Sequence, residues 1–418
     1  MEATQRDHET VRVLYSFPIK LGGGRVGCTS WQQVMGLAAA GADVLACPGV
    51  LQTPVASNVK VWPTLSRGKV RISYKLVGRL RSYALHDWIV ARRLEKLVGQ
   101  IDIIHTWPLA ALRTLKEAAR LGIPTVYERP NSNTRYFYEQ VRMECERLKL
   151  NLSHDHEHQW NEQVLRIEEE EYRLATRLLC PSRHVAQTFL DKGYPAEKLA
   201  RHHYGFDAKE FSPAEPTPRA DGNFTMLFVG GLSPVKGLHY ALKAWLRSPA
   251  SKTGKFLIAG SATREYIDLL APDLKHLSVQ MLGQRSDIPE LMRQSDVLVL
   301  PSLSEGFPLV VAEAVGSGCV PLISDRITDP CQHMRNALVH PVGDVEKLSQ
   351  QITMLYSDRD LLARLRSACL KTASKVTWTA AGRRLLNVYR DVLAANSSSD
   401  SHQLIAANRI PVVAAHCN

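Results

Sequence analysis

The sequence predicts an α/β protein built from two doubly wound domains, and three observations lead to this prediction. The chain has 418 residues, enough for roughly two to three domains. Short apolar runs alternate with amphipathic helical patterns along most of it, and the alternation starts again after a proline-containing segment, residues 211–223. Strands that are apolar along their whole length are typical of parallel sheets that helices cover on both faces.

The expected strands are runs of three to seven apolar-rich residues. Those of the first half are Val11–Phe17, Ala42–Cys47, Ile101–His105, Thr125–Tyr127 and Leu178–Pro181. Those of the second half are Thr225–Gly230, Lys255–Ala259, Val279–Leu282, Val297–Pro301 and Val320–Ser324. Helical patterns fall between them at Ser30–Ala40, Leu109–Leu121 and Leu348–Tyr356, and 139–172 has the pattern of a long polar helical region. Each block of alternation predicts one parallel sheet.

The predicted domain boundary is the segment 211–223, FSPAEPTPRADGN, whose three prolines and one glycine break regular structure. We therefore expect a first domain over 1–210, the linker at 211–223 and a second domain over 224–378. A last helix is expected within 379–395, and the Ser/Asp-containing stretch 396–418 has the composition of a loosely ordered tail.

Composition narrows the class of protein. Hydrophobic residues make up 45% and charged residues 22%, as in globular proteins, which argues against wholesale disorder. The first ten residues lack the apolar core of a secretory leader, and no apolar run reaches the length of a membrane-spanning helix. Eight scattered cysteines without a C-x-x-C pair are typical of reduced core residues. We therefore expect a cytoplasmic protein.

The net charge of +11 is concentrated in one region. Between residues 60 and 96, ten basic residues stand against two acidic ones, a local charge of +8, with apolar residues interleaved. Two interpretations stay open: a solvated surface beside a core strand, or a surface for an anionic acceptor or for the inner face of a membrane. Nucleic acid is disfavoured, because no motif of a nucleic-acid-binding fold accompanies the charge.

The most informative stretch is residues 295–324, SDVLVLPSLSEGFPLVVAEAVGSGCVPLIS. An apolar strand runs into a turn, Pro301–Gly306, and then into a helix that opens near Pro308. In open parallel sheets ligands bind beyond the carboxyl ends of the strands, where such turns lie. The amides of Phe307 and Leu309 would then be free at the positive end of a helix, which suits a diphosphate.

Two carboxylates flank this helix start. Glu305 precedes the helix and Glu313 lies about two turns later. Ionised carboxylates accept hydrogen bonds from hydroxyls, so the pair suits a ligand with phosphate in the middle and hydroxyls at each end. Taken alone, two glutamates eight residues apart are better explained as solvated helix charges.

The combined pattern resembles a known family. D-V-L-V-L-P-S, E-G-F-P-L-V-V-A-E-A and G-S-G-C-V-P-L-I-S are similar to the E-x7-E signature of retaining nucleotide-sugar glycosyltransferases with the GT-B fold, related to sucrose and glycogen synthases and to bacterial cell-surface mannosyl- and glucosyltransferases. Further similar segments, in the order of the family, are 227–237 (LFVGGLSPVKG), 257–261 (LIAGS), 279–284 (VQMLGQ), 336–344 (NALVHPVGD) and, more loosely, the glycine-rich 21–27 (LGGGRVG). The resemblance covers nearly all of residues 11–393 and implies two Rossmann-like domains that face a cleft.

The resemblance also implies roles for individual residues. Glu305 would bind the donor sugar and Lys236 the leaving diphosphate, as catalytic residues, while Glu313 would bind the ribose hydroxyls. The remaining donor-binding candidates are Gly306, Phe307, Leu309, Gly231, Gly283 and Arg285. Candidates for the acceptor and diphosphate loop are Gly23, Gly24, Arg25, His105 and Arg129. The last helix would return to the first domain. No metal ion or other cofactor is expected, because lysine and a helix terminus supply the positive charge.

Two departures from the family pattern matter. Gly231 stands where the family usually has a phosphate-binding arginine, which Arg285 or Arg25 would have to replace. Residues 127–131, Y-E-R-P-N, stand where the family tends to have a histidine near the anomeric carbon. His105 is the alternative on the acceptor side, and a core histidine is an equally open interpretation of it.

Two weaker signals are set aside. The histidines of 154–158 (HDHEH) lack the H-E-x-x-H pattern of a zinc site. Asp358-Arg359-Asp360 follows a helical pattern, so a helix cap is favoured over a metal site.

The sequence therefore predicts a hexosyltransferase-type, retaining glycosyltransferase that uses a nucleotide-diphosphate sugar. Its product would be a cell-surface polysaccharide, a glycolipid or a small glycoside, and a lipid-linked acceptor is one open class. The base, the sugar and the acceptor stay open. The alternatives are a nucleotide-binding protein of the same fold without turnover and an epimerase or phosphorylase of the same fold.

Overall fold

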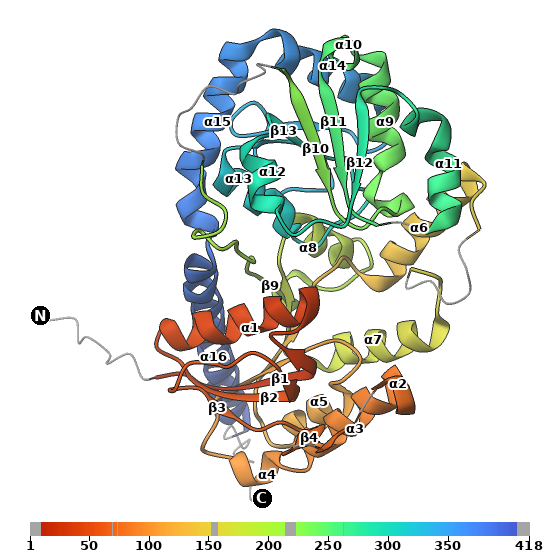
Figure 1. Ribbon diagram of the computed structural model, residues 1–418. Helices are drawn as coiled ribbons and strands as arrows, with labels where there is room; N and C mark the ends of the chain where they lie inside the picture. Colours follow the sequence, from red (N-terminus) through yellow and green to blue (C-terminus); the bar gives the residue numbers. More distant parts are fainter. Residues whose placement is uncertain are drawn as a thin grey trace, which may run out of the picture. The chain divides into compact units, whose positions relative to one another are not determined.

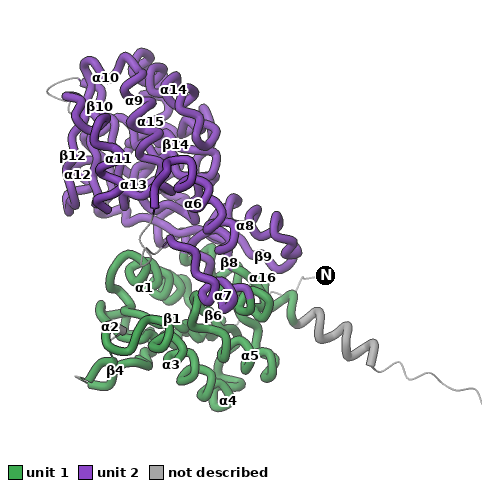
Figure 2. Tube along the Cα trace, turned by 90° about the vertical axis from the view of Figure 1, so that its right-hand side faces the viewer, with its two compact units in different colours: residues 1–127, 170–178, 382–418 green, residues 128–169, 179–381 purple. Residues whose placement is uncertain are grey.

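The computed structural model describes residues 10–68, 70–72, 74–151, 158–213, 223–261 and 263–407. The chain divides into two compact units (Figure 2). Unit 1 comprises residues 1–127, 170–178 and 382–418, and unit 2 comprises 128–169 and 179–381. Most of the predicted linker, residues 214–222, lies outside the described residues.

A parallel sheet forms from the first half of the sequence (Figure 1). Among the described residues its strand order is β3-β2-β1-β6-β7-β8-β9. The strands are β1 (Arg12–Leu21), β2 (Asp43–Leu51), β3 (Lys60–Val61), β6 (Ile103–Thr106), β7 (Thr125–Glu128), β8 (Arg177–Cys180) and β9 (Leu199–Arg201). Every residue of β6 and β7 is buried, which explains their uninterrupted apolar character. A short antiparallel hairpin, β4 (Ser66–Arg67) and β5 (Val70–Arg71), stands apart from the sheet.

Helices of unit 1 cover this sheet on two faces. The glycine-rich helix α1 packs on β1 and β2, while α3 packs on β1 and on α5 (Figure 1). The helices of the first half are α1 (Gly24–Ala39), α2 (Tyr74–Val77), α3 (Arg79–Ala91), α4 (Leu94–Leu97), α5 (Leu112–Arg120), α6 (Thr134–Leu148), α7 (Glu162–Leu174) and α8 (Arg183–Leu190), with a 3₁₀ turn η1 (Ala196–Lys198). The predicted long helical region 139–172 is thus wrong as one element, because α6 ends at Leu148 and Lys149 takes a left-handed conformation.

The second sheet lies wholly in unit 2, with the order β12-β11-β10-β13-β14-β15 among the described residues. All its pairings are parallel. The strands are β10 (Thr225–Val229), β11 (Lys255–Ala259), β12 (Val279–Gly283), β13 (Val297–Leu300), β14 (Val320–Ser324) and β15 (Leu338–His340). The order reverses between β10 and β13, which is the switch point where doubly wound sheets bind ligands.

The helices of the second half form two packed groups, α9 with α10, α11 and α14, and α13 with α12 and α15 (Figure 1). Their bounds are η2 (Pro234–Lys236), α9 (Leu238–Arg247), α10 (Ala250–Thr253), α11 (Arg264–Leu274), α12 (Ile288–Arg293), α13 (Leu309–Ser317), α14 (Val345–Ser357), α15 (Arg359–Ala373), η3 (Ser374–Val376) and α16 (Trp378–Ala407). Asp358 caps α15 by accepting a hydrogen bond from the Leu361 amide, so the predicted cap is confirmed. The prediction of a two-domain α/β fold with parallel sheets is confirmed as well.

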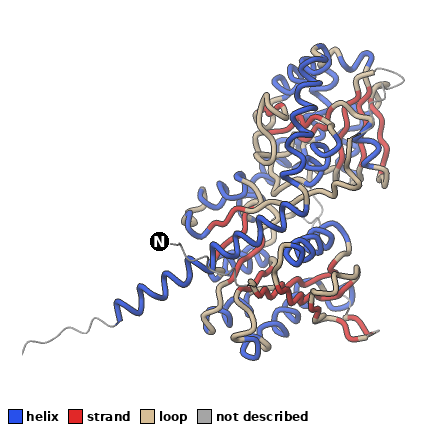
Figure 3. Tube along the Cα trace, turned by 90° about the vertical axis from the view of Figure 1, so that its left-hand side faces the viewer, coloured by secondary structure: helices blue, strands red, loops and turns tan. Residues whose placement is uncertain are grey.

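The last helix, α16, joins unit 1 from residue 382 onward. Gly382 lies against the backbone of Gly36 in α1, where a Cβ atom would overlap it, and the Tyr389 hydroxyl lies 2.6 Å from His105 Nδ1. The helix runs to Ala407, beyond the predicted end at residue 395, so the expected tail from 396 is helical over its first part (Figure 3). Residues 408–418 lie outside the described residues. In the described part of the chain, no helix is both long and apolar enough to span a bilayer.

A buried histidine in unit 1 makes the stability of the fold sensitive to acid. His86 of α3 is fully buried between Ser16 Oγ, 2.8 Å from its Nε2, and Thr64 Oγ1, 2.6 Å from its Nδ1. Burial lowers the pKa of His86 to about 3. The unfolded chain therefore takes up a proton below about pH 6.5 while the folded chain stays neutral, so this stability is present above pH 6.5 and is lost as the pH falls.

We expect the substitution His86→Gln to weaken the acid sensitivity of folding. Between pH 7.5 and pH 5.0, the free energy of unfolding of the wild type should fall by about 2 kcal/mol more than that of the variant, at about 1.4 kcal/mol per pH unit below 6.5. Urea titrations at the two pH values measure this difference. An equal pH dependence in His86→Gln and wild type would contradict the assignment.

Candidate functional site

Two loops at the carboxyl ends of neighbouring strands bring an ammonium and a carboxylate together. Lys236 ends the turn η2 that follows β10, and Glu305 lies in the loop between β13 and α13. Lys236 Nζ lies 2.6 Å from Glu305 Oε1, and Ser302 Oγ donates to the same oxygen at 2.8 Å. The structure thus joins the two residues that the sequence predicted to be catalytic, and it adds Ser302, which the sequence analysis did not select.

Backbone contacts explain why the two loops run side by side. The Leu303 amide donates to the Val235 carbonyl at 2.8 Å, and Ser324 Oγ donates to the Ser302 carbonyl at 2.6 Å. Gly237 has a φ of 71° and approaches the Pro301 carbonyl so closely that a Cβ atom would come within 2.3 Å of its oxygen. Only glycine fits both the conformation and the space at this point.

The carboxylate of Glu305 depends on these partners, because it is almost completely buried. Its side chain is 7% exposed, whereas that of Lys236 is 29% exposed. Burying a charge without a partner is costly, and a charge-assisted hydrogen bond offsets part of that cost. The more open side of the pair is therefore the ammonium group, which is the group that an incoming anion would meet.

The start of α13 adds backbone donors to this site. Pro308 occupies the N-cap position without a side-chain cap, and the first helical residue, Leu309, is half-buried. The Phe307 ring is buried and lies edge to face on Tyr204, at 6.1 Å between centroids. Glu313 is the fifth residue of α13 and is half-buried.

Three further glycines mark the ends of adjacent strands. The amides of Gly230 and Gly260 donate to the carbonyls of Ala259 and Gly283, at 3.0 and 2.8 Å, which continues the ladder past β10, β11 and β12. Gly231 follows as a half-buried residue. Arg285, the predicted substitute for the phosphate-binding arginine, is held by Asp287 at 2.5 Å on the loop before α12. This ion pair raises the pKa of Arg285.

Within unit 2, residues 129–131, which follow β7, lie against Gly306, the residue after Glu305. A Cβ atom on Gly306 would come within 1.7 Å of the Pro130 carbonyl oxygen, so these two backbones touch. Asn131, which follows, is exposed. Arg129 is buried and does not face solvent: its Nη2 donates to the Ser132 carbonyl at 2.7 Å, and its Nη1 lies 3.3 Å from Glu168. Arg129 therefore holds the segment in shape.

The other candidates belong to unit 1. Gly23 caps α1, and Gly24, with a φ of 68°, is exposed together with Arg25 at the helix start. His105 is fully buried; its ring stacks on Tyr15 with centroids 4.3 Å apart and contacts the Tyr389 hydroxyl. Of the two interpretations that the sequence left open for His105, the structure thus favours that of a core histidine.

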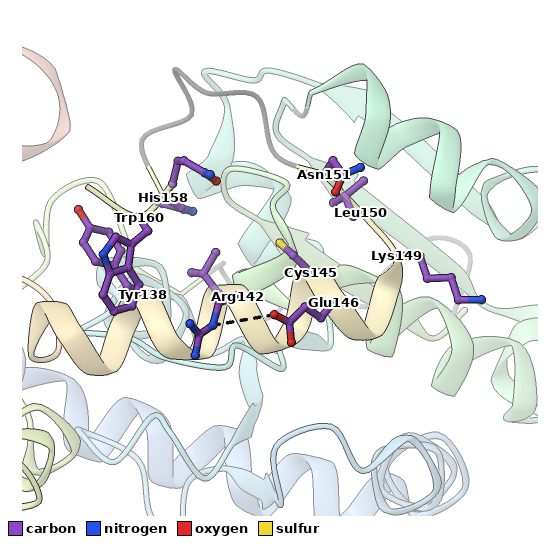
Figure 4. A pocket seen from close by; sticks show the side chains of 11 residues that line it. Tyr138, Arg142, Cys145, Glu146, Lys149, Leu150, Asn151, His158 and Trp160 are labelled. Atoms are coloured by element: carbon purple, nitrogen blue, oxygen red, sulfur yellow. Dashed lines mark ion pairs between the residues drawn. The ribbon is translucent and has the colours of Figure 1, made fainter. Parts of the chain in front are cut away.

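The described residues contain no cluster of three or more His, Cys, Asp or Glu side chains suited to a metal ion. Residues 154–157 of the histidine-rich segment lie outside the described residues. A pocket of about 440 Å³ borders α6 and the segment 158–160, with Tyr138, Cys145 and Trp160 in its wall (Figure 4). None of the predicted site residues lines it.

The contact between Gly306 and Pro130 yields a test of the site's construction. The substitution Gly306→Ala should destabilise the protein by about 1–3 kcal/mol or more, because the new methyl group overlaps a backbone carbonyl. Gly283→Ala is the matched control: its φ is 66° but nothing lies within 4 Å of the added atom, so we expect a cost of about 1 kcal/mol from the backbone alone. Thermal unfolding compares the two. Equal losses would show that Gly306 is not packed as described.

Comparison with known proteins agrees with this architecture. The family model "Glycosyltransferase Family 4" matches residues 31–210, and "Glycosyl transferases group 1" matches residues 223–358. The N,N'-diacetylbacillosaminyl-diphospho-undecaprenol alpha-1,3-N-acetylgalactosaminyltransferase of Campylobacter jejuni is 31% identical over 118 residues, which is 28% of this chain and about a third (31%) of that relative's length. The D-inositol 3-phosphate glycosyltransferase of Thermobispora bispora is 25% identical over 351 residues, covering 76% of this chain and 74% of the relative.

A similar solved structure is that of Anabaena HepE in complex with UDP-glucose. Its TM-score is 0.63 at 16% identity, and the match covers 93% of this chain and 99% of HepE, which shows a shared fold. The two family models together span most of the chain, one in each half, and both Glu305 and Glu313 fall within the second. The chain therefore has the GT-B fold, and each of its halves matches the model of a glycosyltransferase family.

Proposed function

We propose that the protein transfers a hexose from a nucleotide-diphosphate donor to an acceptor hydroxyl, with retention of the anomeric configuration. The observation that carries the proposal is the pair of Lys236 and Glu305 beside the start of α13. It combines a cation and backbone donors for a diphosphate with a carboxylate for a sugar. The names of the three relatives support it, since two are glycosyltransferases by name and the third binds UDP-glucose.

Each group at the site has a role in this proposal. The diphosphate binds Lys236 Nζ and the amides at the start of α13, while Glu313 accepts hydrogen bonds from the ribose hydroxyls. Glu305 exchanges its contact with Lys236 for a sugar hydroxyl as the diphosphate takes the ammonium group. Positive charge that is already in position stabilises the negative charge that develops on the leaving group. We therefore propose a transfer step that does not use a metal ion.

In the proposed transfer, one bond breaks and one forms on the same face of the anomeric carbon, which retains its configuration. The bond between the anomeric carbon and the β-phosphate oxygen breaks, and the acceptor oxygen bonds to the same carbon on the same face. The acceptor proton moves to the departing phosphate oxygen, which is the nearest base on that face. The enzyme then contributes by binding, orientation and charge stabilisation.

A lipid-linked acceptor at the inner face of a membrane is the acceptor class we propose. The Campylobacter relative acts, by its name, on a diphospho-undecaprenol. The basic region of unit 1 has fitting chemistry: a groove of about 830 Å³ is lined by residues that include Arg67, Arg71 and Arg93. Val70, which also lines the groove, is 72% exposed, and Leu76 of the following helix α2 is 88% exposed. Exposed apolar side chains next to arginines suit an anionic, amphiphilic surface.

The direct test incubates the purified protein with UDP-, GDP- and ADP-sugars and follows donor loss and product formation by chromatography. We expect at least one donor to be hydrolysed slowly without acceptor, and transfer when a polyprenyl-diphosphate sugar is added. No loss of any donor, with or without the acceptor, would refute the proposal. Conversion of a donor into an isomeric sugar nucleotide, or transfer to inorganic phosphate, would indicate an epimerase or a phosphorylase.

Substitutions at the site should separate binding from turnover. Glu313→Ala removes the carboxylate that is proposed to accept hydrogen bonds from the ribose hydroxyls. The lost hydrogen bonds are worth roughly 1–3 kcal/mol, so the donor KM should rise about tenfold or more. Lys236→Met should lower kcat about 10²–10³-fold, because it acts on the leaving charge. Initial-rate kinetics measure both. Wild-type constants in the two variants would discredit the assignment.

The membrane contact makes a separate prediction. In vesicle sedimentation at low salt, the wild type should bind phosphatidylglycerol vesicles, and the variant Val70→Asp/Leu76→Asp should bind at least tenfold more weakly. Leu277→Asp is the control, since Leu277 is 98% exposed in unit 2 and should not affect binding. Equal binding to phosphatidylcholine vesicles, or no binding at all, would eliminate the contact.

A second candidate function, nucleotide binding without turnover, is favoured by one observation. Gly231 provides no side chain where the family has an arginine, and Arg285 is engaged with Asp287. Donor binding without hydrolysis or transfer to any acceptor would favour this candidate.

A further inference from the structure

A chain of three buried side chains connects two distant parts of unit 2 to the residue before Glu305. Ser304 Oγ lies 2.8 Å from Ser132 Oγ, and His184 Nε2 lies 3.3 Å from Ser304 Oγ. Ser132 belongs to the segment after β7, and His184 belongs to the first turn of α8. All three side chains are buried, with exposed fractions of 6% or less. Such a buried chain is specific, because each group needs its partner.

The position of His184 is itself fixed from several sides. Its amide donates to Thr328 Oγ1 at 3.1 Å, and the Tyr136 ring meets the imidazole edge to face at 5.7 Å between centroids. Burial, and next the nearby charge of Arg326, lower the pKa of His184 to about 4. The imidazole is therefore neutral near pH 7. A neutral ring supplies one donor and one acceptor, and either tautomer closes the chain to Ser304.

These hydrogen bonds fix the loop between β13 and α13, which contains Glu305. On one side of Glu305, Ser304 is held by His184 and Ser132; on the other, Gly306 is packed against Pro130. The backbone of Glu305 is thus fixed at both neighbours, and its carboxylate can meet Lys236 Nζ at 2.6 Å. A shift of about 1 Å in such a group is enough to cost roughly two orders of magnitude in rate.

We propose that His184 is a positioning residue of the transfer reaction: it holds Ser304, with Ser132, so that Glu305 keeps its place beside Lys236. This inference rests on the proposed function for its kinetic consequences. It assigns a role to a buried side chain of α8 that acts through Ser304.

The test compares two polar substitutions of similar size. In His184→Gln the side-chain amide reaches the place of Nε2, whereas in His184→Asn it reaches only the place of Nδ1. We expect His184→Asn to lower kcat about 10- to 100-fold with little change in the donor KM, and His184→Gln to restore most of the wild-type kcat. Equal activities of the two variants would overturn the proposal, because a merely space-filling role would not distinguish them.

The single variant Ser304→Ala keeps the proposal falsifiable if His184→Asn is unstable, and a double-mutant cycle adds a further test. Ser304→Ala cuts the chain at its centre without altering the histidine, and it should lower kcat about as much as His184→Asn does. In the Ser304→Ala background, the further substitution His184→Asn should have almost no additional effect on kcat. Additive effects would show that His184 does not act through Ser304.

A readout without turnover separates this inference from the proposed function. Lysines methylated with ¹³C report their surroundings by NMR, and Lys236→Arg identifies the signal of Lys236. In ligand-free Ser304→Ala protein, that signal should move toward the position of exposed lysines if Glu305 has left its place. An unchanged Lys236 signal overturns the positioning role, whether or not any sugar donor is a substrate.

Discussion

The ion pair of Lys236 and Glu305 is the interaction on which the candidate site depends. Glu305 is 7% exposed, and a carboxylate buried to that degree needs compensating partners. Its partners are Lys236, from the turn after β10, and Ser302, from the loop after β13 that also contains Glu305. Because the ammonium group is the more exposed partner, an anionic ligand can compete for it. Lys236 can therefore pair with Glu305 when no ligand is bound and with a diphosphate when one binds.

Unit 2, which contains the Lys236–Glu305 pair, is built from segments of both halves of the sequence. Residues 128–169, which the sequence predicts in the first domain, cluster with the second sheet. One physical reason is Glu144 of α6, whose Oε1 lies 2.7 Å from His239 Nε2 and whose Oε2 accepts a bond from the Tyr240 hydroxyl. Burial alone would raise the pKa of Glu144, but the hydrogen bonds from His239 and Arg147 lower it to about 2. A charged, satisfied side chain thus ties α6 to α9 at neutral pH.

The sequence predicts those features that local patterns determine. Strands β11 and β14 occur where their apolar runs indicate, and the loop after β13 brings Glu305 to the switch point of the sheet. It does not predict pairings between distant residues. The contact of His105 with Tyr389 spans 284 positions, and no local signal identifies it. Arg285, which the resemblance gave as one possible phosphate ligand, pairs with Asp287 in the structure. The serines and the histidine around Ser304 have no sequence pattern that reveals them as a group.

We propose that Lys236, Glu305, Glu313 and the start of α13 form the binding site of a nucleotide-diphosphate sugar. A crystal structure of the protein with UDP would test this site. We expect a diphosphate oxygen at about 2.7–3.2 Å from Lys236 Nζ, a second one near the amides of residues 307–310, and the ribose hydroxyls on Glu313. UDP bound elsewhere, with Lys236 still paired to Glu305 beside an unoccupied helix start, would contradict it.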